Sequence, residues 1–240
     1  MFKLTRCAPR LLVLAVLALG FAGCTQTKTF VHDRVPKSPA GGVDVLLLEP
    51  DVQLSELSAG GIAFPKADWT EQGRANVHAA LVRIMGRKNA RLVYYEPPGA
   101  VALDDPYTQI LKLHEAVGAE ILADKYSRGS LLALPTKKDK FDWTLGPDVR
   151  YLREAYAADY ALFVYFRDSF ASGGRVAMMA VLAMAGVALP GGLQVGYASL
   201  VDLNSGDILW FNVLSSQAGD LRDPESAVES TENLLDELPL

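Results

Sequence analysis

The sequence predicts an α/β fold: a single domain with a mixed β-sheet, flanked by helices, whose last strands form an antiparallel hairpin. Short apolar runs alternate with stretches whose apolar residues recur at helical spacing. Residues 160–166 are apolar on both faces, as expected for a central strand. Near the end of the chain, residues 196–203 and 207–212 are rich in β-forming side chains and flank a tight turn at Asn204-Ser205-Gly206.

The first elements follow from apolar spacing. A buried strand is expected over 43–48, because this apolar run stops at Glu49-Pro50. Residues 68–71, Asp-Trp-Thr-Glu, have the spacing of a capping box, which predicts that a helix begins there. A second strand is expected over 91–95, before Pro97-Pro98-Gly99. The helix between these strands has one apolar face, which consists of Val77, Leu81, Ile84 and Met85.

Three further helices are predicted from proline and capping signals. One begins at Asp105-Pro106, since proline is tolerated in a first turn, and a shorter one follows Gly146-Pro147. The last begins at Asp223-Pro224. The apolar stripe expected in the first of these helices is Ile110, Leu113, Val117 and Ile121, and in the last it is Val228, Thr231, Leu235 and Leu238.

The amino terminus has the features of an export signal. Lys3, Arg6 and Arg10 precede an apolar run over 11–19, which is too short to span a bilayer. Ala22-Gly23-Cys24 then resembles the lipobox of bacterial lipoproteins, in which the cysteine is lipidated and the peptide is cut before it. This resemblance implies a signal peptide over 1–23, lipid on Cys24 and attachment to a membrane. Thr25 stands where an inner-membrane retention signal has Asp, so the periplasmic face of the outer membrane is expected.

Composition divides the remaining chain and limits its partners. Residues 24–42 are polar and rich in Pro and Gly, which predicts a lipidated flexible tether before a domain over 43–240. Without Lys3, Arg6 and Arg10 the net charge changes from −5 to −8, which argues against nucleic acid as a partner. Only Cys24 remains after cleavage, so neither a disulfide nor a zinc site built on several cysteines is expected.

Two segments resemble a known group of envelope proteins. Residues 160–166 (YALFVYF) and 197–212 (YASLVDLNSGDILWFN) resemble the α/β domain of the curli secretion lipoprotein and the amino-terminal domain of TolB. Other envelope lipoproteins share this fold. The resemblance implies a fold and a compartment rather than a task, and that group has no shared catalytic residues to carry over.

Catalytic patterns are scarce. The sequence has no P-loop, dinucleotide-binding or serine-nucleophile motif, and His114-Glu115 lacks the second histidine of a zinc helix. The isolated His32, His78 and His114 are interpreted as structural or solvated, and no pair of acids is singled out for hydrolysis. We therefore expect no catalytic residue, metal or cofactor. The lowest-ranked alternative is a cell-wall hydrolase.

The apolar insertion at 173–192 needs a separate explanation. No charged residue occurs between Val176 and Val201, and Ala and Met favour a helix over a strand. Three interpretations remain open: a helix buried in the domain, a helix that docks on a partner or on other copies, or a helix that inserts into the membrane. The residues proposed for partner or membrane contact are Met178, Met179, Leu182, Met184, Val187 and Leu189.

The sequence thus favours a non-enzymatic, membrane-anchored lipoprotein that assists envelope assembly, secretion or transport through protein–protein contact. Its expected partners are the membrane, through lipidated Cys24, and envelope proteins or its own copies. An oligomeric, membrane-active assembly related to secretion pores is the principal alternative.

Overall fold

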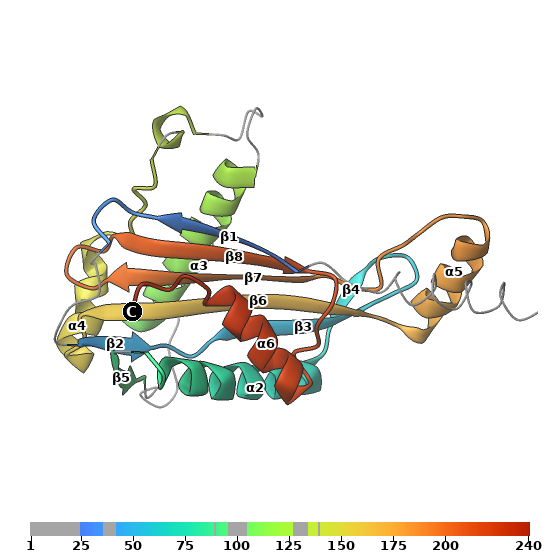
Figure 1. Ribbon diagram of the computed structural model, residues 1–240, viewed down its shortest axis with the longest axis horizontal. Coiled ribbons are helices and arrows are strands. Elements are labelled where there is room, and N and C mark those ends of the chain that lie inside the picture. Colours follow the sequence, from blue (N-terminus) through green and yellow to red (C-terminus); the bar gives the residue numbers. More distant parts are fainter. Residues whose placement is uncertain (1–24, 36–41, 89, 96–104, 127–133, 139) are drawn as a thin grey trace, which may run out of the picture.

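A long antiparallel strand pair forms the centre of the computed structural model, which describes residues 25–35, 42–88, 90–95, 105–126, 134–138 and 140–240 (Figure 1). Strand β6 (Tyr160–Ala171) pairs antiparallel with β7 (Gln194–Asp202), and β7 pairs antiparallel with β8 (Ile208–Ser216). The turn between β7 and β8 contains Gly206, whose φ of 84° is the left-handed conformation that favours glycine. The predicted central strand and carboxyl-terminal hairpin are confirmed.

The other half of the sheet is largely parallel. Strand β2 (Val43–Leu47) lies between β6 and β5 (Ala90–Tyr94) and pairs parallel with both. After β2 ends, β3 (Asp51–Leu57) continues along the same side of β6, again parallel, and pairs with the short β4 (Ala63–Pro65). The strand order β1-β8-β7-β6-β2-β5, with β3 and β4 beside the far half of β6, makes the sheet mixed.

The tether prediction is wrong at residues 26–31. Strand β1 (Gln26–Val31) pairs antiparallel with β8, with Gln26 opposite Ser215, and forms one edge of the sheet. The polar composition of this segment suits an edge strand with one solvated face, because strand pairing depends on backbone hydrogen bonds and not on apolar side chains. The folded domain therefore begins near residue 25 and not at residue 43.

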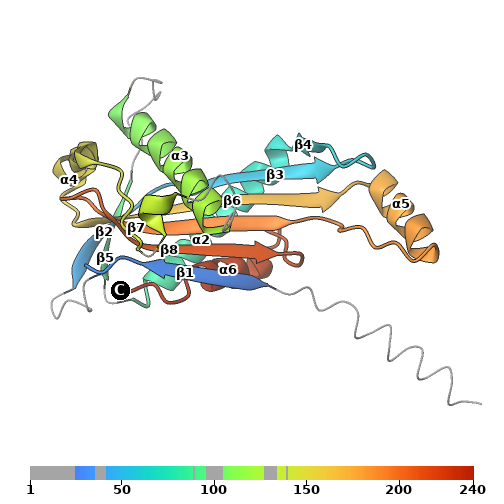
Figure 2. The ribbon, with the colours of Figure 1, turned by 90° about the horizontal axis from the view of Figure 1, so that it is seen from above.

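Helices cover both faces of the sheet (Figures 1 and 2). On one face, α2 (Ala67–Met85) and α6 (Pro224–Leu234) pack on a core that includes Leu162, Val164 and Phe166 of β6. On the other face, α3 (Pro106–Tyr126) and α4 (Arg150–Tyr156) pack on a core that includes Ala161 and Phe163. Two single-turn 3₁₀ helices, η2 (Pro135–Lys137) and η3 (Pro147–Val149), lie between α3 and α4. The predicted single α/β domain is confirmed.

The predicted helix starts are confirmed at two positions and wrong at a third. Asp105 accepts hydrogen bonds from the backbone of Tyr107 and Thr108, and Asp223 caps α6 in the same way. Helix α2, in contrast, begins at Ala67 without a side-chain cap, so the capping box at residues 68–71 does not form. Its Thr70 hydroxyl binds the backbone of Leu54 instead, which joins α2 to β3.

The buried face of α2 agrees with the prediction, whereas that of α3 is rotated. Leu113 is exposed and His114 is buried in its place, so the predicted stripe is wrong at this position. The face that packs on the sheet includes Gly118, which lies against the Tyr197 ring where a larger residue would clash. The buried apolar face of α2 is Val77, Leu81, Ile84 and Met85, as predicted.

Candidate functional site

The apolar insertion forms a helix at one end of the sheet. Helix α5 (Gly173–Met184) follows β6 and precedes β7, and Figures 1 and 2 both show it beyond the end of the sheet, away from the other helices. Among its residues only Arg175 is buried, while Val181 is 61% exposed and Met184 is 83% exposed. The interpretation of α5 as a core helix is therefore wrong, and the two contact interpretations remain.

The residues that the sequence proposed for contact share this location but differ in exposure. Met184 and Val187 are exposed, and Met179 packs against Gly191 in the segment that returns to the sheet. Partly buried in the same region are Met178, Met179, Leu182 and Leu189. The proposed lipidation site, Cys24, lies outside the described residues.

The turn between β3 and β4 lies beside α5. The backbone N–H of Ser172 donates to the Leu57 carbonyl, which joins the two segments. Ile62 of this turn and Phe64 of β4 are exposed apolar side chains. We call residues 57–65 and 172–193 together the apolar tip. Sequence reasoning missed the first segment, although its uncharged run from residue 57 to residue 65 is visible in the sequence.

Arg175 holds the apolar tip together from inside. Its side chain is only 7% exposed, and its Nε and Nη2 atoms donate to the Pro190 carbonyl at 3.1 and 2.9 Å. Nη1 donates to the Ser58 carbonyl at 3.4 Å. A buried guanidinium is stable only where its donors are paired, and here they satisfy backbone carbonyls that would otherwise need water. The single charge of the tip is therefore a structural one.

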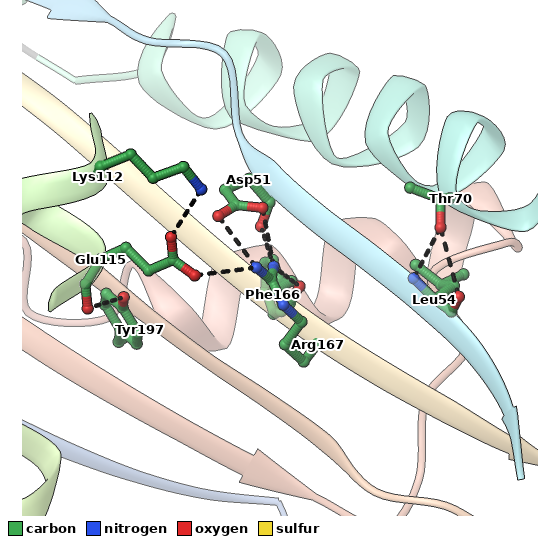
Figure 3. Close-up of polar contacts among 8 residues, drawn as sticks. All are labelled: Asp51, Leu54, Thr70, Lys112, Glu115, Phe166, Arg167 and Tyr197. Atoms are coloured by element: carbon green, nitrogen blue, oxygen red, sulfur yellow. Dashed lines mark hydrogen bonds and ion pairs between the residues drawn. The ribbon is translucent and has the colours of Figure 1, made fainter. Parts of the chain in front are cut away.

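A second candidate site is a groove of about 310 Å³ where β2 and β5 end, beside the first half of α3. At its rim Arg167 bonds Asp51 at 2.9 Å and lies 3.8 Å from Glu115, which in turn pairs with Lys112 at 3.0 Å (Figure 3). The two acids are therefore joined by a cation and do not face each other across open space. Exposed ion pairs of this kind contribute little to stability.

Of the polar side chains that line this groove, His114 is hydrogen-bonded, whereas the Tyr95 hydroxyl is buried without a hydrogen-bond partner. His114 lies 2.8 Å from the Ser199 hydroxyl and stacks on Phe163, with ring centroids 4.3 Å apart. Burial lowers the pKa of His114 to about 3, so its imidazole is neutral at physiological pH. Tyr95 and Tyr107 stack at 3.8 Å, and burial raises the pKa of Tyr95 to about 12. His114 is thus buried rather than solvated, and its interpretation as structural stays a prediction.

The described residues contain neither a membrane-spanning helix nor a metal-binding cluster. No helix there combines the length and the apolar character that crossing a membrane requires. That part of the chain also contains no group of three or more His, Cys, Asp or Glu side chains placed to hold a metal ion.

Comparison with known proteins gives distant structural matches. No protein-family model matches the sequence, and no curated protein matches it. The PelC dodecamer from Paraburkholderia phytofirmans matches with a TM-score of 0.41 and 11% identity over 90% of this chain and 98% of that chain. A variant of that protein in another crystal form matches with a TM-score of 0.39 over the same shares. Similarity this low carries no argument about function, and it does not support the specific resemblance to the curli secretion lipoprotein or TolB.

Proposed function

We propose that this protein is a lipid-anchored component of the cell envelope that assists assembly, secretion or transport through contacts made by its apolar tip. The exposure of α5 carries the proposal. Monomeric soluble proteins rarely expose a continuous apolar surface unless it is an interaction site. In the apolar tip the exposed apolar side chains come from both segments: Ile62, Phe64, Val176, Val181, Met184, Val187 and Leu193.

The anchor determines where these contacts take place. Lipid on Cys24 would confine the domain to the periplasmic face of the outer membrane. Confinement raises the effective concentration of the tip for any component of the same membrane, so that contacts too weak in solution become occupied. A tether of this kind requires no catalytic step.

The described titratable groups support a role without catalysis. A paired-acid hydrolase needs two carboxyl groups on opposite sides of the scissile bond, one of them free to donate a proton. The acids that line the groove are Glu49, Asp51 and Glu115. Arg167 lies between Asp51 and Glu115, and Arg74 lies 3.7 Å from Glu49, so each acid has a cation beside it. The neutral His114 also lines the groove, but its side chain is only 5% exposed and its Nε2 atom lies 2.8 Å from the Ser199 hydroxyl, so it is poorly placed to reach a substrate as a general base.

Thiol accessibility in native membranes tests the proposal. In the full chain, Met184→Cys would place a thiol at the apolar tip, and Glu154→Cys would place the matched control on the exposed side of α4. A membrane-impermeant maleimide is added to opened envelope vesicles from cells that express each variant. We expect the thiol at position 184 to be protected and the thiol at position 154 to react, with reactivity at 184 restored by detergent.

The same experiment tests the anchor. The unsubstituted chain should not react in membranes or in detergent, because the Cys24 thiol is consumed by lipid and Cys7 is removed with residues 1–23. Reaction of the unsubstituted chain would contradict the anchor. Equal reactivity at positions 184 and 154 in intact membranes would contradict the contact role of the tip.

A further inference from the structure

We propose that the apolar tip docks into the lipid surface beside the anchor, so that the sheet stands on the membrane at its α5 end. This inference rests on the proposed function and specifies what the tip contacts. Two independent features of the structure lead to it: the position of residue 25 and the chemistry of the tip.

The chain enters the fold at the same end of the sheet as the tip. The Thr25 hydroxyl lies 2.9 Å from that of Ser216, the last residue of β8. Ser216 pairs with Gln194, and Gln194 pairs with Asp168, from which β6 runs three more residues to its end before α5. Figure 2 shows the start of β1 at the side of the sheet from which α5 extends.

This arrangement places the lipid near the tip without any assumption about residues 1–23. Cys24 is covalently bonded to Thr25, and consecutive Cα atoms are about 3.8 Å apart. Three strand residues from Asp168 to the end of β6 add about 10 Å. A lipid on Cys24 therefore begins within a short distance of the plane from which α5 projects, and both can enter the same leaflet.

The side chains of the tip fit lipid better than a specific protein partner. Residues 57–65 and 172–193 contain three polar or charged side chains: Ser58, Ser172 and Arg175. The Ser58 hydroxyl accepts from the Ile62 N–H, that of Ser172 accepts from the Arg175 N–H, and Arg175 donates to carbonyls within the tip. A specific protein interface carries about one hydrogen bond per 100–200 Å² and a polar rim. Among the side chains of the tip, only the O–H donors of these two serines are left to supply them.

Backbone N–H and C=O groups of α5 have hydrogen-bond partners, which makes partial burial of this helix in lipid possible. A backbone group without a partner is costly in hydrocarbon, where water cannot replace it. Within α5 the backbone groups pair with one another through helical hydrogen bonds, and the Ser172 side chain caps the first turn. Outside the helix, Arg175 donates to the carbonyls of Ser58 and Pro190. Twelve residues extend about 18 Å, well short of the roughly 30 Å hydrocarbon core, so α5 penetrates one leaflet at most.

Docking of the tip fixes the orientation of the domain relative to the membrane, in addition to attaching it. Lipid alone would leave the domain free to rotate about residue 25. A second contact on the same side holds the sheet upright, which turns α4 and the ends of β7 and β8 nearest to it away from the membrane (Figure 1). The groove between β2, β5 and α3 would then be held at a constant distance from the lipid surface.

Flotation of lipid-free protein with vesicles tests this inference separately from the anchor. Residues 25–240 are used, because every described contact of the fold lies within them. The vesicles are phosphatidylethanolamine and phosphatidylglycerol at 3:1, and phosphatidylcholine alone. We expect binding to both compositions with little effect of salt, since the tip has no exposed charge.

The matched variants carry the same charge change at exposed apolar positions. Val181→Asp with Met184→Asp alters the tip, and Leu113→Asp with Tyr151→Asp alters α3 and α4. We expect the tip variant to bind at least about tenfold more weakly, because removing one buried apolar side chain from lipid already corresponds to about that factor. The control variant should bind as the unsubstituted chain does, and circular dichroism should show both variants folded.

Absence of flotation, or equal flotation of the tip variant, would overturn the inference. Self-association that the tip variant abolishes, without flotation, would show instead that the tip binds another copy. In that case the proposed contact role would stand and the lipid assignment would fall. The proposed function itself fails only if the tip is also unprotected in native membranes.

Discussion

A buried carboxyl at the base of the tip makes the stability of this protein depend on pH. Asp168 lies in β6 near the point where β6 and β7 leave the sheet, and its side chain is 4% exposed. Its carboxylate accepts from the Gln194 side chain at 3.0 Å and from the Leu221 N–H at 3.4 Å. Burial outweighs these hydrogen bonds and raises the pKa of Asp168 to about 6.

The direction of the effect follows from the two pKa values. In the unfolded chain the carboxyl titrates near 3.8, so between pH 3.8 and about 6 the folded state binds more protons than the unfolded state. The free energy of unfolding therefore falls as pH rises through this range. A shift of about two pKa units corresponds to a loss of up to about 3 kcal/mol above pH 6.

Asp168→Asn removes this dependence. The neutral amide can accept the existing hydrogen bonds, and it can donate to the Gln194 Oε1 atom, which is buried without a partner. In residues 25–240, we expect this substitution to raise the free energy of unfolding by up to about 3 kcal/mol at pH 7.5. At pH 4 the free energies of unfolding of the variant and of the unsubstituted chain should be nearly equal. Urea unfolding followed by tryptophan fluorescence at the two pH values measures the difference.

Glu154→Gln on the exposed side of α4 is the matched control, and it should leave the difference between the two pH values unchanged. A variant at Asp168 that is less stable at pH 7.5, or that differs equally from the unsubstituted chain at both pH values, would refute this reasoning.

Three further measurements test contacts inside the fold. The pKa of His114 is lowered to about 3 from an unfolded value near 6.5, so its contribution to stability is lost as pH falls below 6.5; NMR should show no titration of this ring between pH 5.5 and 8. Gly118→Ala places a methyl group 2.5 Å from the Tyr197 ring and should lower the free energy of unfolding by about 1–3 kcal/mol, measured by urea titration. Arg175→Met unpairs the Pro190 carbonyl and should increase amide hydrogen exchange within the apolar tip, with little change in the global unfolding temperature.

The sheet and its helices could be predicted because their signals are local. Residues 160–166 are apolar on both faces and lie at the centre of the sheet, and the hairpin after them has its turn at Gly206. Strand β3 was missed although Val52 and Leu54 alternate with polar residues, because Pro50 before it reads as the end of a strand. Strand β1 could not be predicted from its polar side chains, since β8 supplies its partner atoms from a segment almost 190 residues away.

The apolar tip could be predicted in part from the sequence, whereas the groove could not, because only the first has a signal within a single segment. The apolar character of residues 173–192 is visible in the sequence, but burial depends on whether another element covers the helix, and none of the described elements covers Met184. The groove at the end of β2 unites Asp51, Glu115 and Arg167 from three elements, and their proximity depends on the register of β3 against β6 and on how α3 packs on the sheet. No periodicity in a single segment could reveal it.

Light scattering on residues 25–240, compared with the same chain lacking residues 175–190, shows directly whether the apolar tip is a contact surface. Arg175 bonds the Pro190 carbonyl, so the ends of the deleted segment are near each other and the deletion can close without disturbing β6 or β7. We expect the intact chain to self-associate or to take up detergent, whereas the deletion variant should be a folded monomer that takes up none. An intact chain that is a detergent-free monomer, together with a deletion that unfolds, would show that α5 is a structural element and contradict its role as a contact surface.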